Sequence, residues 1–238
     1  MTKPRPAEFK WRQFEPQFIL MAVGWYLRFS LSYRDVEELL LERGLSADHV
    51  TVWRWVQRYA PELERRLRSR LKPTNKSWRV DETYIRVKGK WTYLYRAVDS
   101  AGASIDFLLS ARRDAAAAKR FFQKALRGLN HPTPRVINVD RNPSYPAVVE
   151  ALKSEGALHG RCCLRPVQYL NNILEQDHRA IKRRVRASQG FRSFWGAYRT
   201  IQGYEAVHAI RKGQARWVGT GQIVRQLHFI AKLFQITI

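Results

Sequence analysis

The first part of the chain carries apolar side chains at the spacing of helices. The pattern predicts a helix over residues 18–27, a second over residues 32–41 that opens with a capping box, and a third from Ser46 or Asp48 to residue 59. A short turn that contains a glycine separates the second helix from the third. This part of the chain is therefore expected to be a three-helix module.

Residues 61–75 interrupt the helical pattern. Pro61 opens this segment, and five arginine and lysine residues then outnumber two glutamates before Pro73. We expect a basic connector here, after which the spacing changes to that of strands.

From residue 78 onward the pattern is that of strands, followed by alternating helices and strands. Three segments rich in β-branched and aromatic residues predict successive antiparallel strands over residues 78–87, 91–99 and 104–110. A helix, a short buried strand and two more helices are then predicted over residues 114–126, 135–140, 146–155 and 171–186. This order is the one expected of an α/β fold with an RNase H-like mixed sheet flanked by helices.

These patterns predict two folded units in a chain of 238 residues. Residues 1–60 are expected to form a small all-α helix-turn-helix domain, and residues 61–75 a basic linker. Residues 76–238 are expected to form the α/β domain with a C-terminal helical extension.

The composition points to a polyanionic partner. Lysine and arginine number 43 against 20 aspartate and glutamate residues, so the formal net charge is +23 at pH 7. Nucleic acid is the leading partner for such a charge. An anionic membrane is the alternative, but it calls for an amphipathic basic helix or a polybasic tail, whereas this charge is spread along the chain.

The sequence shows neither a targeting segment nor a structural metal motif. The N-terminus lacks the apolar run of a signal peptide, and residues 18–27 are about half as long as a membrane span requires, so we expect a cytoplasmic protein without membrane contact. Cys162 and Cys163 are adjacent, which is unfavourable for a disulfide and does not match zinc-ligand spacing.

Three acidic residues stand where separate elements can bring them together. Asp81 lies within a predicted strand, Asp140 at the end of another, and Glu175 near the start of a helix. An acid in a basic protein is most often a solvated salt-bridge partner. An unpaired carboxylate among the apolar neighbours of Asp81, however, calls for a compensating ion. Three carboxylates from separate elements suffice to hold a pair of divalent cations.

Other acids compete for this role. Glu82 is expected to point to the opposite face of its strand. Asp99 and Asp106 can cap turns or pair with arginines. Asp177 is two residues from Glu175 and so does not share its helix face.

Several segments carry a resemblance to a known family. They are WRVDETYI, KGKWTYLYRAVD, RVINVD, NNILEQDHRAIKRR and IRKGQ. In this order they resemble the bacterial transposases of the insertion sequence six family, over nearly the entire chain. The resemblance implies that Asp81, Asp140 and Glu175 form a DDE triad that holds Mg²⁺, with two ions expected and Mn²⁺ able to substitute. It also implies a bacterial protein associated with the nucleoid.

The chain departs from the family pattern in two places. The residue after the second acid is usually lysine in this family and is Arg141 here, which keeps the charge but changes the donor geometry. Residues 156–169, which hold the two cysteines, also differ. Neither departure removes an expected metal ligand, and Arg141 remains a candidate DNA contact.

The three-helix module resembles a helix-turn-helix, whose second helix would enter the major groove. Its apolar residues Val50, Trp53 and Val56 are expected to face the core. The outward residues, which are the candidate base contacts, are Thr51, Arg54, Gln57 and Arg58. The basic connector would add affinity for phosphates.

Cations also follow the third acid of the triad. Arg179, Lys182 and Arg186 fall on one helical stripe with Glu175 and His178, so they are candidate DNA phosphate contacts. The alternative is an amphipathic helix in which Arg179 pairs with Glu175. An aromatic side chain can also stack on a flipped terminal base, but aromatics of strands more often lie in the core. The aromatics considered are Trp91, Tyr93, Tyr95, Trp195 and Tyr198.

The sequence thus predicts a metal-dependent DNA transposase. It would bind the inverted-repeat ends of its element, nick the 3′ ends and join them to target DNA, and the resemblance implies replicative cointegrate formation. Because one polypeptide cannot easily hold two ends and a target, a homodimer or higher oligomer is expected on DNA. The alternatives are an inactive DNA-binding regulator and an RNase H-like nuclease that does not join strands.

Overall fold

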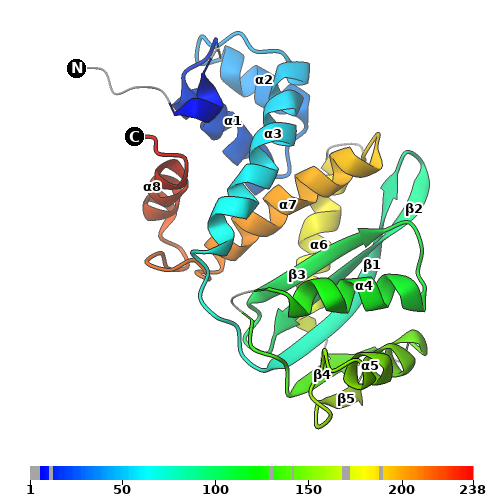
Figure 1. Ribbon diagram of the computed structural model, residues 1–238. Coiled ribbons are helices and arrows are strands. Elements are labelled where there is room, and N and C mark those ends of the chain that lie inside the picture. The colour runs from blue at the N-terminus through cyan, green and yellow to red at the C-terminus, as the bar shows by residue number, and fades with distance from the viewer. Residues whose placement is uncertain are drawn as a thin grey trace. The chain divides into compact units, whose positions relative to one another are not determined.

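The chain divides into two compact units in the computed structural model (Figure 1). The structure describes residues 6–10, 13–128, 131–140, 142–167, 172–187 and 190–237. The sheet unit spans Lys72–Arg183. The helical unit comprises Met1–Leu71 and Arg184–Ile238.

The sheet unit is built on a five-stranded mixed sheet in the order β3-β2-β1-β4-β5. Its strands are β1 (Ser77–Val87), β2 (Lys90–Asp99), β3 (Ser104–Ser110), β4 (Val136–Val139) and β5 (Cys163–Pro166). The first three form an antiparallel meander, and β4 and β5 add to β1 in parallel. Lys88 and Gly89 both have positive φ, 50° and 75°, which is the backbone of a tight two-residue hairpin turn between β1 and β2.

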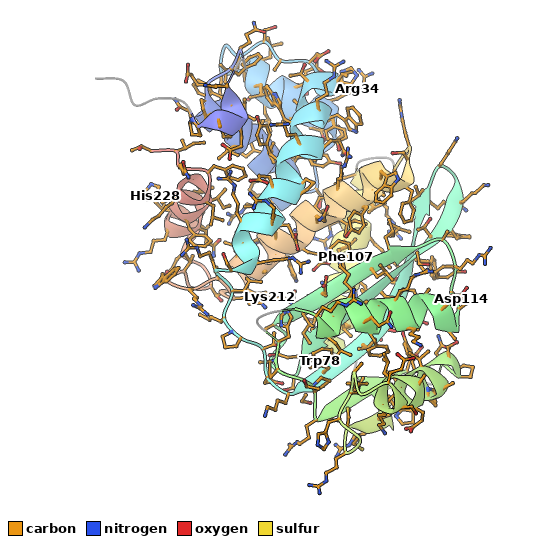
Figure 2. The ribbon with its side chains drawn as sticks, in the orientation of Figure 1. Arg34, Trp78, Phe107, Asp114, Lys212 and His228 are labelled. Carbon is orange, nitrogen blue, oxygen red and sulfur yellow. The ribbon has the colours of Figure 1, made fainter. Side chains whose placement is uncertain are left out.

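Helices cover both faces of this sheet (Figure 1). They are α4 (Ala115–Leu126), α5 (Ser144–Ser154) and α6 (Asn172–Ala187). On the face of α4 and α5, an apolar cluster joins Trp78 and Tyr95 of the sheet to Phe121 and Val149 of the helices. In Figure 2, Trp78 is labelled on the sheet and Asp114 at the start of α4. On the other face, α6 carries polar groups to the sheet, and these form the site described below.

The predicted α/β fold with an RNase H-like mixed sheet is confirmed. The strands of the meander and β4 occur where the sequence predicts them. Strand β5 falls in a segment for which no element was predicted, because it is only four residues long, mostly exposed, and ends in Pro166. Helix α5 starts two residues before the predicted position, with Pro146 in its first turn, where the missing N–H leaves no bond unmade.

The helical unit packs around one long helix, α3. Its elements are the short 3₁₀ turn η1 (Ala7–Phe9) and the helices α1 (Pro16–Arg28), α2 (Tyr33–Leu41), α3 (His49–Arg68), α7 (Phe194–Arg211) and α8 (Ile223–Leu233). Helix α3 contacts α1, α2, α7 and α8. The predicted capping box is formed, since Ser32 N donates to Asp35 (2.7 Å) and Asp35 N donates to the Ser32 hydroxyl (3.1 Å).

Helix α3 differs from the sequence expectation at its C-terminal end. It continues to Arg68, so residues 61–68 are helical rather than part of a linker. Pro61 lies inside the helix and removes one backbone hydrogen bond, a cost of about 3 kcal/mol in a helix interior. The buried side chains of Leu63 and Leu67 continue the apolar stripe past the proline. Tertiary packing therefore outweighs the unfavourable effect of Pro61 on the helix.

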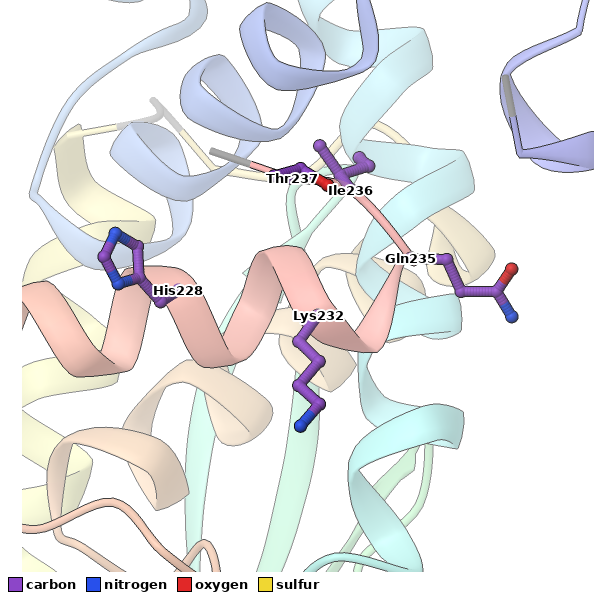
Figure 3. A pocket seen from close by; sticks show the side chains of 5 residues that line it. All are labelled: His228, Lys232, Gln235, Ile236 and Thr237. Carbon is purple, nitrogen blue, oxygen red and sulfur yellow. The ribbon is translucent and has the colours of Figure 1, made fainter. Parts of the chain in front are cut away.

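The C-terminal helices also group differently from the expectation. Residues 184–238 pack with the N-terminal helices rather than extending the sheet unit. A hollow of about 340 Å³ beside α8 is lined by His228, Lys232, Gln235, Ile236 and Thr237 (Figure 3). The described residues of this lining include no aspartate or glutamate, so they do not offer the ligands of a magnesium site.

In the described part of the chain, none of the helices combines the length and apolarity needed to cross a membrane.

Substitution of Gly203 in α7 tests how tightly the helices of the helical unit pack. A Cβ at this position would lie 2.6 Å from Cβ of Ala60 and 2.7 Å from a methyl group of Leu27. We predict that Gly203→Ala lowers the free energy of unfolding by about 1–3 kcal/mol, measured by urea denaturation, because both neighbours must move. The matched control is Gly24→Ala in α1, where no described atom lies within 4 Å and a gain of up to about 1 kcal/mol is expected. Equal stability of the two variants would contradict this packing.

Candidate active site

Asp81 and Asp140 are brought together by the pairing of two neighbouring strands. Strands β1 and β4 run parallel with Arg79 opposite Asn138. Asp81 follows Arg79 by two residues within β1, and Asp140 follows Asn138 by two residues, directly after the end of β4. Continuing the register therefore places the two acids side by side. One ligand oxygen from each of Asp81, Glu82 and Asp140 lies within 4.8 Å of the others.

Burial and nearby negative charge disfavour the ionised forms of Asp81 and Asp140. The side chain of Asp81 is 17% exposed. Burial, followed by the charges of Glu82, Asp140 and Glu175, raises the pKa of Asp81 to about 7. Burial and Glu82 also raise the pKa of Asp140. Such a cluster gains most from a cation that offsets the negative charge.

Glu82 belongs to this cluster but is occupied by protein donors. Its side chain is 3% exposed. One oxygen accepts hydrogen bonds from Arg113 Nε (2.7 Å) and Asn142 Nδ2 (2.8 Å), and the other accepts the Tyr145 hydroxyl. The sequence placed Glu82 on the opposite strand face and so left it out of the site. The sequence pattern missed the contribution of Glu82 because its partners come from two distant segments, those that follow β3 and β4.

Glu175 lies in the first turn of α6, with its side chain 57% exposed and its carboxylate 3.9 Å from Arg179. Among the described residues it is not part of the group of oxygens within 4.8 Å. It is close enough to contribute to the raised pKa of Asp81. The structure therefore brings two of the three predicted ligands together and places the third in electrostatic range of Asp81.

His178 faces the site from the buried side of α6. Its Nδ1 lies 3.8 Å from Asp81 Oδ2, and the side chain is 8% exposed. Burial, with the charges of Arg96 and Lys182, lowers the pKa of His178 to about 3, so the imidazole is neutral at physiological pH. A neutral ring leaves Asp81 without a compensating protein cation at this contact.

Asp177 anchors α6 to the sheet. Its carboxylate lies 3.3 Å from Arg96 Nη2, and both side chains are almost completely buried. Arg96 is the cross-strand neighbour of Asp81 on β2. The ion pair thus ties the helix that carries Glu175 to the strand pair that carries Asp81.

The other acids considered from the sequence have structural roles. Asp99 accepts hydrogen bonds from the backbone N–H groups of Asn75, Ala101 and Ala103 and so organises the turn between β2 and β3. Asp106 pairs with Lys124 of α4 at 2.8 Å.

The buried stripe of α3 lies at a different phase from the one predicted. Trp53 was expected to lie in the core and Gln57 to face outward, but Trp53 is 43% exposed and Gln57 only 9%. The Gln57 amide donates to the Thr200 hydroxyl (3.0 Å) and to the Gly196 carbonyl (3.4 Å). Gln57 is therefore committed to packing against α7, and its prediction as a DNA contact is corrected.

The remaining candidate DNA contacts of α3 stay accessible. Arg54 and Arg58 are exposed, and Thr51 is half-buried at the start of the helix. In the basic segment that follows, Arg65 pairs with Glu62 and Arg68 with Glu64, so part of its charge is balanced internally.

The cations of α6 have distinct surroundings. Arg179 and Arg186 are exposed, whereas Lys182 is half-buried with its Nζ over the Tyr84 ring at 4.6 Å from the centroid. Arg184 is buried and donates to the Arg28 carbonyl (3.3 Å). Arg141 lies outside the described residues.

Comparison with known proteins identifies the family. A family described as DDE domain matches residues 75–214. The transposase for insertion sequence-like element IS431mec of Staphylococcus aureus strain N315 is 41% identical over 212 residues, covering 87% of this chain and 90% of that protein. The transposase for insertion sequence element IS257 in transposon Tn4003 of Staphylococcus aureus is 40% identical with the same coverage. The chain belongs to the insertion sequence six family of DDE transposases.

Similar solved structures include the simian T-cell lymphotropic virus intasome in complex with PP2A regulatory subunit B56 gamma. The TM-score is 0.46 at 16% identity, over 70% of this chain and 56% of that chain. A likeness of this size carries no conclusion about the activity of the transposase.

Membership of this family makes the transposase an enzyme of the polynucleotidyl transferase type. The DDE family uses divalent metal ions, and the acidic cluster at Asp81 and Asp140 provides ligands of the type that such ions prefer.

The raised pKa of Asp81 implies that the stability of the protein depends on pH. The pKa of Asp81 rises from its ordinary value of 3.8 to about 7 in the folded protein. The free energy of unfolding therefore falls as the pH rises from about 4 to about 7, because the folded state holds the proton more tightly. Above about pH 7 this loss of stability stays constant. We predict that Asp81→Asn, in a metal chelator at pH 8, raises the free energy of unfolding by about 2–4 kcal/mol, and by less at pH 5. Chemical denaturation at both pH values measures the difference.

The control for this experiment is Glu150→Gln, which removes an exposed charge from α5 and should change stability by less than about 1 kcal/mol. Destabilisation by Asp81→Asn at pH 8 would contradict the electrostatic description of the site.

The buried ion pair between Arg96 and Asp177 is expected to contribute to stability. We expect Asp177→Asn to lower the free energy of unfolding by about 3–5 kcal/mol, because Arg96 would keep a buried charge without its counterion. Glu175→Gln, two residues away on the exposed face of α6, should cost less than about 1 kcal/mol. Urea denaturation of both variants provides the comparison, and similar losses would refute the anchoring role of Asp177.

Proposed function

We propose that this transposase binds the inverted-repeat ends of its element, nicks the DNA at the 3′ ends and joins the freed 3′-hydroxyl groups to target DNA. Replicative joining into a cointegrate is the outcome that the family likeness favours. The observation that carries the proposal is the parallel register of β1 and β4, which sets Asp81 beside Asp140.

The residues of the site fit a divalent metal centre. Asp81 and Asp140 are partly buried acids with raised pKa values. The Oδ2 atoms of both aspartates make long contacts to basic side chains. Asp81 Oδ2 lies 3.8 Å from His178 Nδ1, and Asp140 Oδ2 lies 3.9 Å from Arg113 Nη2. We propose that these two acids and Glu175 hold two Mg²⁺ ions, for which Mn²⁺ can substitute. When bound, such ions activate the attacking oxygen and stabilise the leaving oxygen of the phosphodiester.

Glu175 is a better candidate than Glu82 for the third ligand. Three donors already engage the oxygens of Glu82, so a metal would have to displace them. Glu175 is exposed, and its ion-pair partner among the described residues is Arg179 at 3.9 Å, so it can turn toward the cluster without breaking a short bond to them. We infer that Glu82 holds Arg113, Asn142 and Tyr145 in place around the two aspartates.

The cations around the cluster suit a phosphate backbone. Arg113 is 47% exposed and lies between Glu82 and Asp140. Arg179 and Lys182 follow Glu175 along α6. We propose that these side chains bind the phosphates next to the cleaved bond, with Arg186 and Arg141 extending the contact.

Recognition of the DNA ends is assigned to residues 1–60. Arg54 and Arg58 are exposed on α3 and suit base or phosphate contacts, with Thr51 beside them. Trp53 adds an exposed aromatic surface to the same helix. We propose at least a homodimer on DNA, because each reaction involves two ends and a target.

A strand-transfer assay with a labelled end duplex tests the chemistry. We predict that Asp81→Asn, Asp140→Asn and Glu175→Gln each reduce joining to background in Mg²⁺ while end binding persists. Glu175→Cys should be inactive in Mg²⁺ and regain measurable joining in Mn²⁺, because the thiolate is a poor ligand for Mg²⁺ and a better one for the softer ion.

Glu82→Cys is the matched control, and no Mn²⁺-specific recovery is expected for it. Recovery by Glu82→Cys but not by Glu175→Cys would reverse the ligand assignment. Normal joining by any of the three triad variants would refute the proposed site. Products of the wild-type protein that are nicked but not joined would identify a nuclease.

A further inference from the structure

The β1–β2 hairpin exposes two large aromatic side chains near its tip. Tyr84 is 51% exposed and Trp91 is 50% exposed. Their ring centroids are 4.8 Å apart with an interplanar angle of 82°. Other aromatics of the sheet unit, such as Trp78 and Tyr95, are at most 1% exposed, so core packing does not account for this pair.

Cations surround the pair. The Arg86 guanidinium lies 4.6 Å from the Trp91 ring centroid, and Lys182 Nζ lies 4.6 Å from the Tyr84 centroid. The turn adds the exposed Lys88 and Lys90. Residues 83–92 contain no acid. Exposed aromatic faces within a basic surface are the combination that binds single-stranded nucleic acid.

Tyr84 shares its strand with Asp81, and Lys182, which contacts Tyr84, shares its helix with Glu175. Tyr84 follows Asp81 by three residues on the same strand, which is about 10 Å along the strand axis. Lys182 follows Glu175 by seven residues on α6, which is about 10.5 Å along the helix axis. These distances equal roughly three nucleotides of stacked DNA, at about 3.4 Å each.

We propose that Tyr84 and Trp91 form a stacking site for an unpaired base of the DNA strand on which the enzyme acts. Arg86 and Lys182 contact the phosphates on either side of that base. The inference deepens the proposed function, because it names the part of the substrate that this surface binds.

An unpaired base is favoured over duplex DNA by the chemistry of the surface. Bases in a duplex are covered on both faces by their neighbours, so an aromatic ring gains little from them, and lysine and arginine alone suffice for phosphates. A base outside the stack offers a free π-face. The excess of positive charge also disfavours a second copy of this chain as the occupant.

The test compares single-stranded and duplex DNA with the full-length protein. Binding of a short oligothymidine and of a blunt duplex is measured by fluorescence anisotropy at one fixed salt concentration. We predict that Trp91→Ala weakens oligothymidine binding about 5- to 150-fold and duplex binding less than about twofold. Trp91→Phe should retain most of the oligothymidine affinity, because an aromatic face remains.

Trp217→Ala is the matched control. Trp217 belongs to the helical unit, is 70% exposed and lies under Arg70, so it shares the chemistry of Trp91 but not its position. The Trp217→Ala variant should bind oligothymidine and duplex DNA with unchanged affinity. Thermal melting confirms that each variant is folded.

A second readout reports stacking directly. An oligonucleotide containing 2-aminopurine should lose fluorescence on binding the wild-type protein and Trp91→Phe, and should keep it with Trp91→Ala. Equal weakening of single-stranded and duplex binding, or full affinity of Trp91→Ala, would overturn the proposal.

The outcome is separable from that of the proposed function. Binding by Asp81→Asn should show the same dependence on Trp91, because stacking does not require the carboxylates. Loss of strand transfer in the triad variants and loss of stacking in Trp91→Ala therefore test different claims.

Discussion

The parallel pairing of β1 with β4 is the constraint on which the site depends. A parallel register fixes which residues lie side by side, and here it aligns Asp81 with Asp140 although they are far apart in the chain. A shift of one residue would turn one of the two acids to the opposite face of the sheet. The apolar cluster beneath β1 and β4 holds this register, because Trp78 and Ile137 pair across the strands and both are fully buried.

Two buried polar networks complete the site from opposite faces of the sheet. On one face, Glu82 collects donors from the segments that follow β3 and β4 and so orders the surroundings of Asp140. On the other face, the ion pair of Arg96 with Asp177 fixes α6 to the strand beside Asp81. Such networks are costly to break once one partner is removed. They keep two repelling carboxylates close together, a state that a bound cation would relieve.

Much of this arrangement could be predicted from the sequence, because alternation of polarity indicates strands, with Asp81 inside one strand and Asp140 directly after another. The rest depends on tertiary contacts. Helical spacing alone did not reveal that Gln57 packs on α7 while Trp53 is exposed, since both residues fit either phase of the pattern. Strand β5 is too short to give a periodic signal. The role of Glu82 depends on donors from distant segments, which no local pattern contains.

We propose that Asp81, Asp140 and Glu175 together hold the metal ions. Anomalous diffraction from Mn²⁺ in crystals of the transposase with an end duplex tests it most directly. We expect anomalous peaks about 2.0–2.3 Å from oxygens of all three side chains, with Glu82 still bound to its protein donors. Peaks at Glu82 with Glu175 turned away, or ions bound only elsewhere, would contradict it.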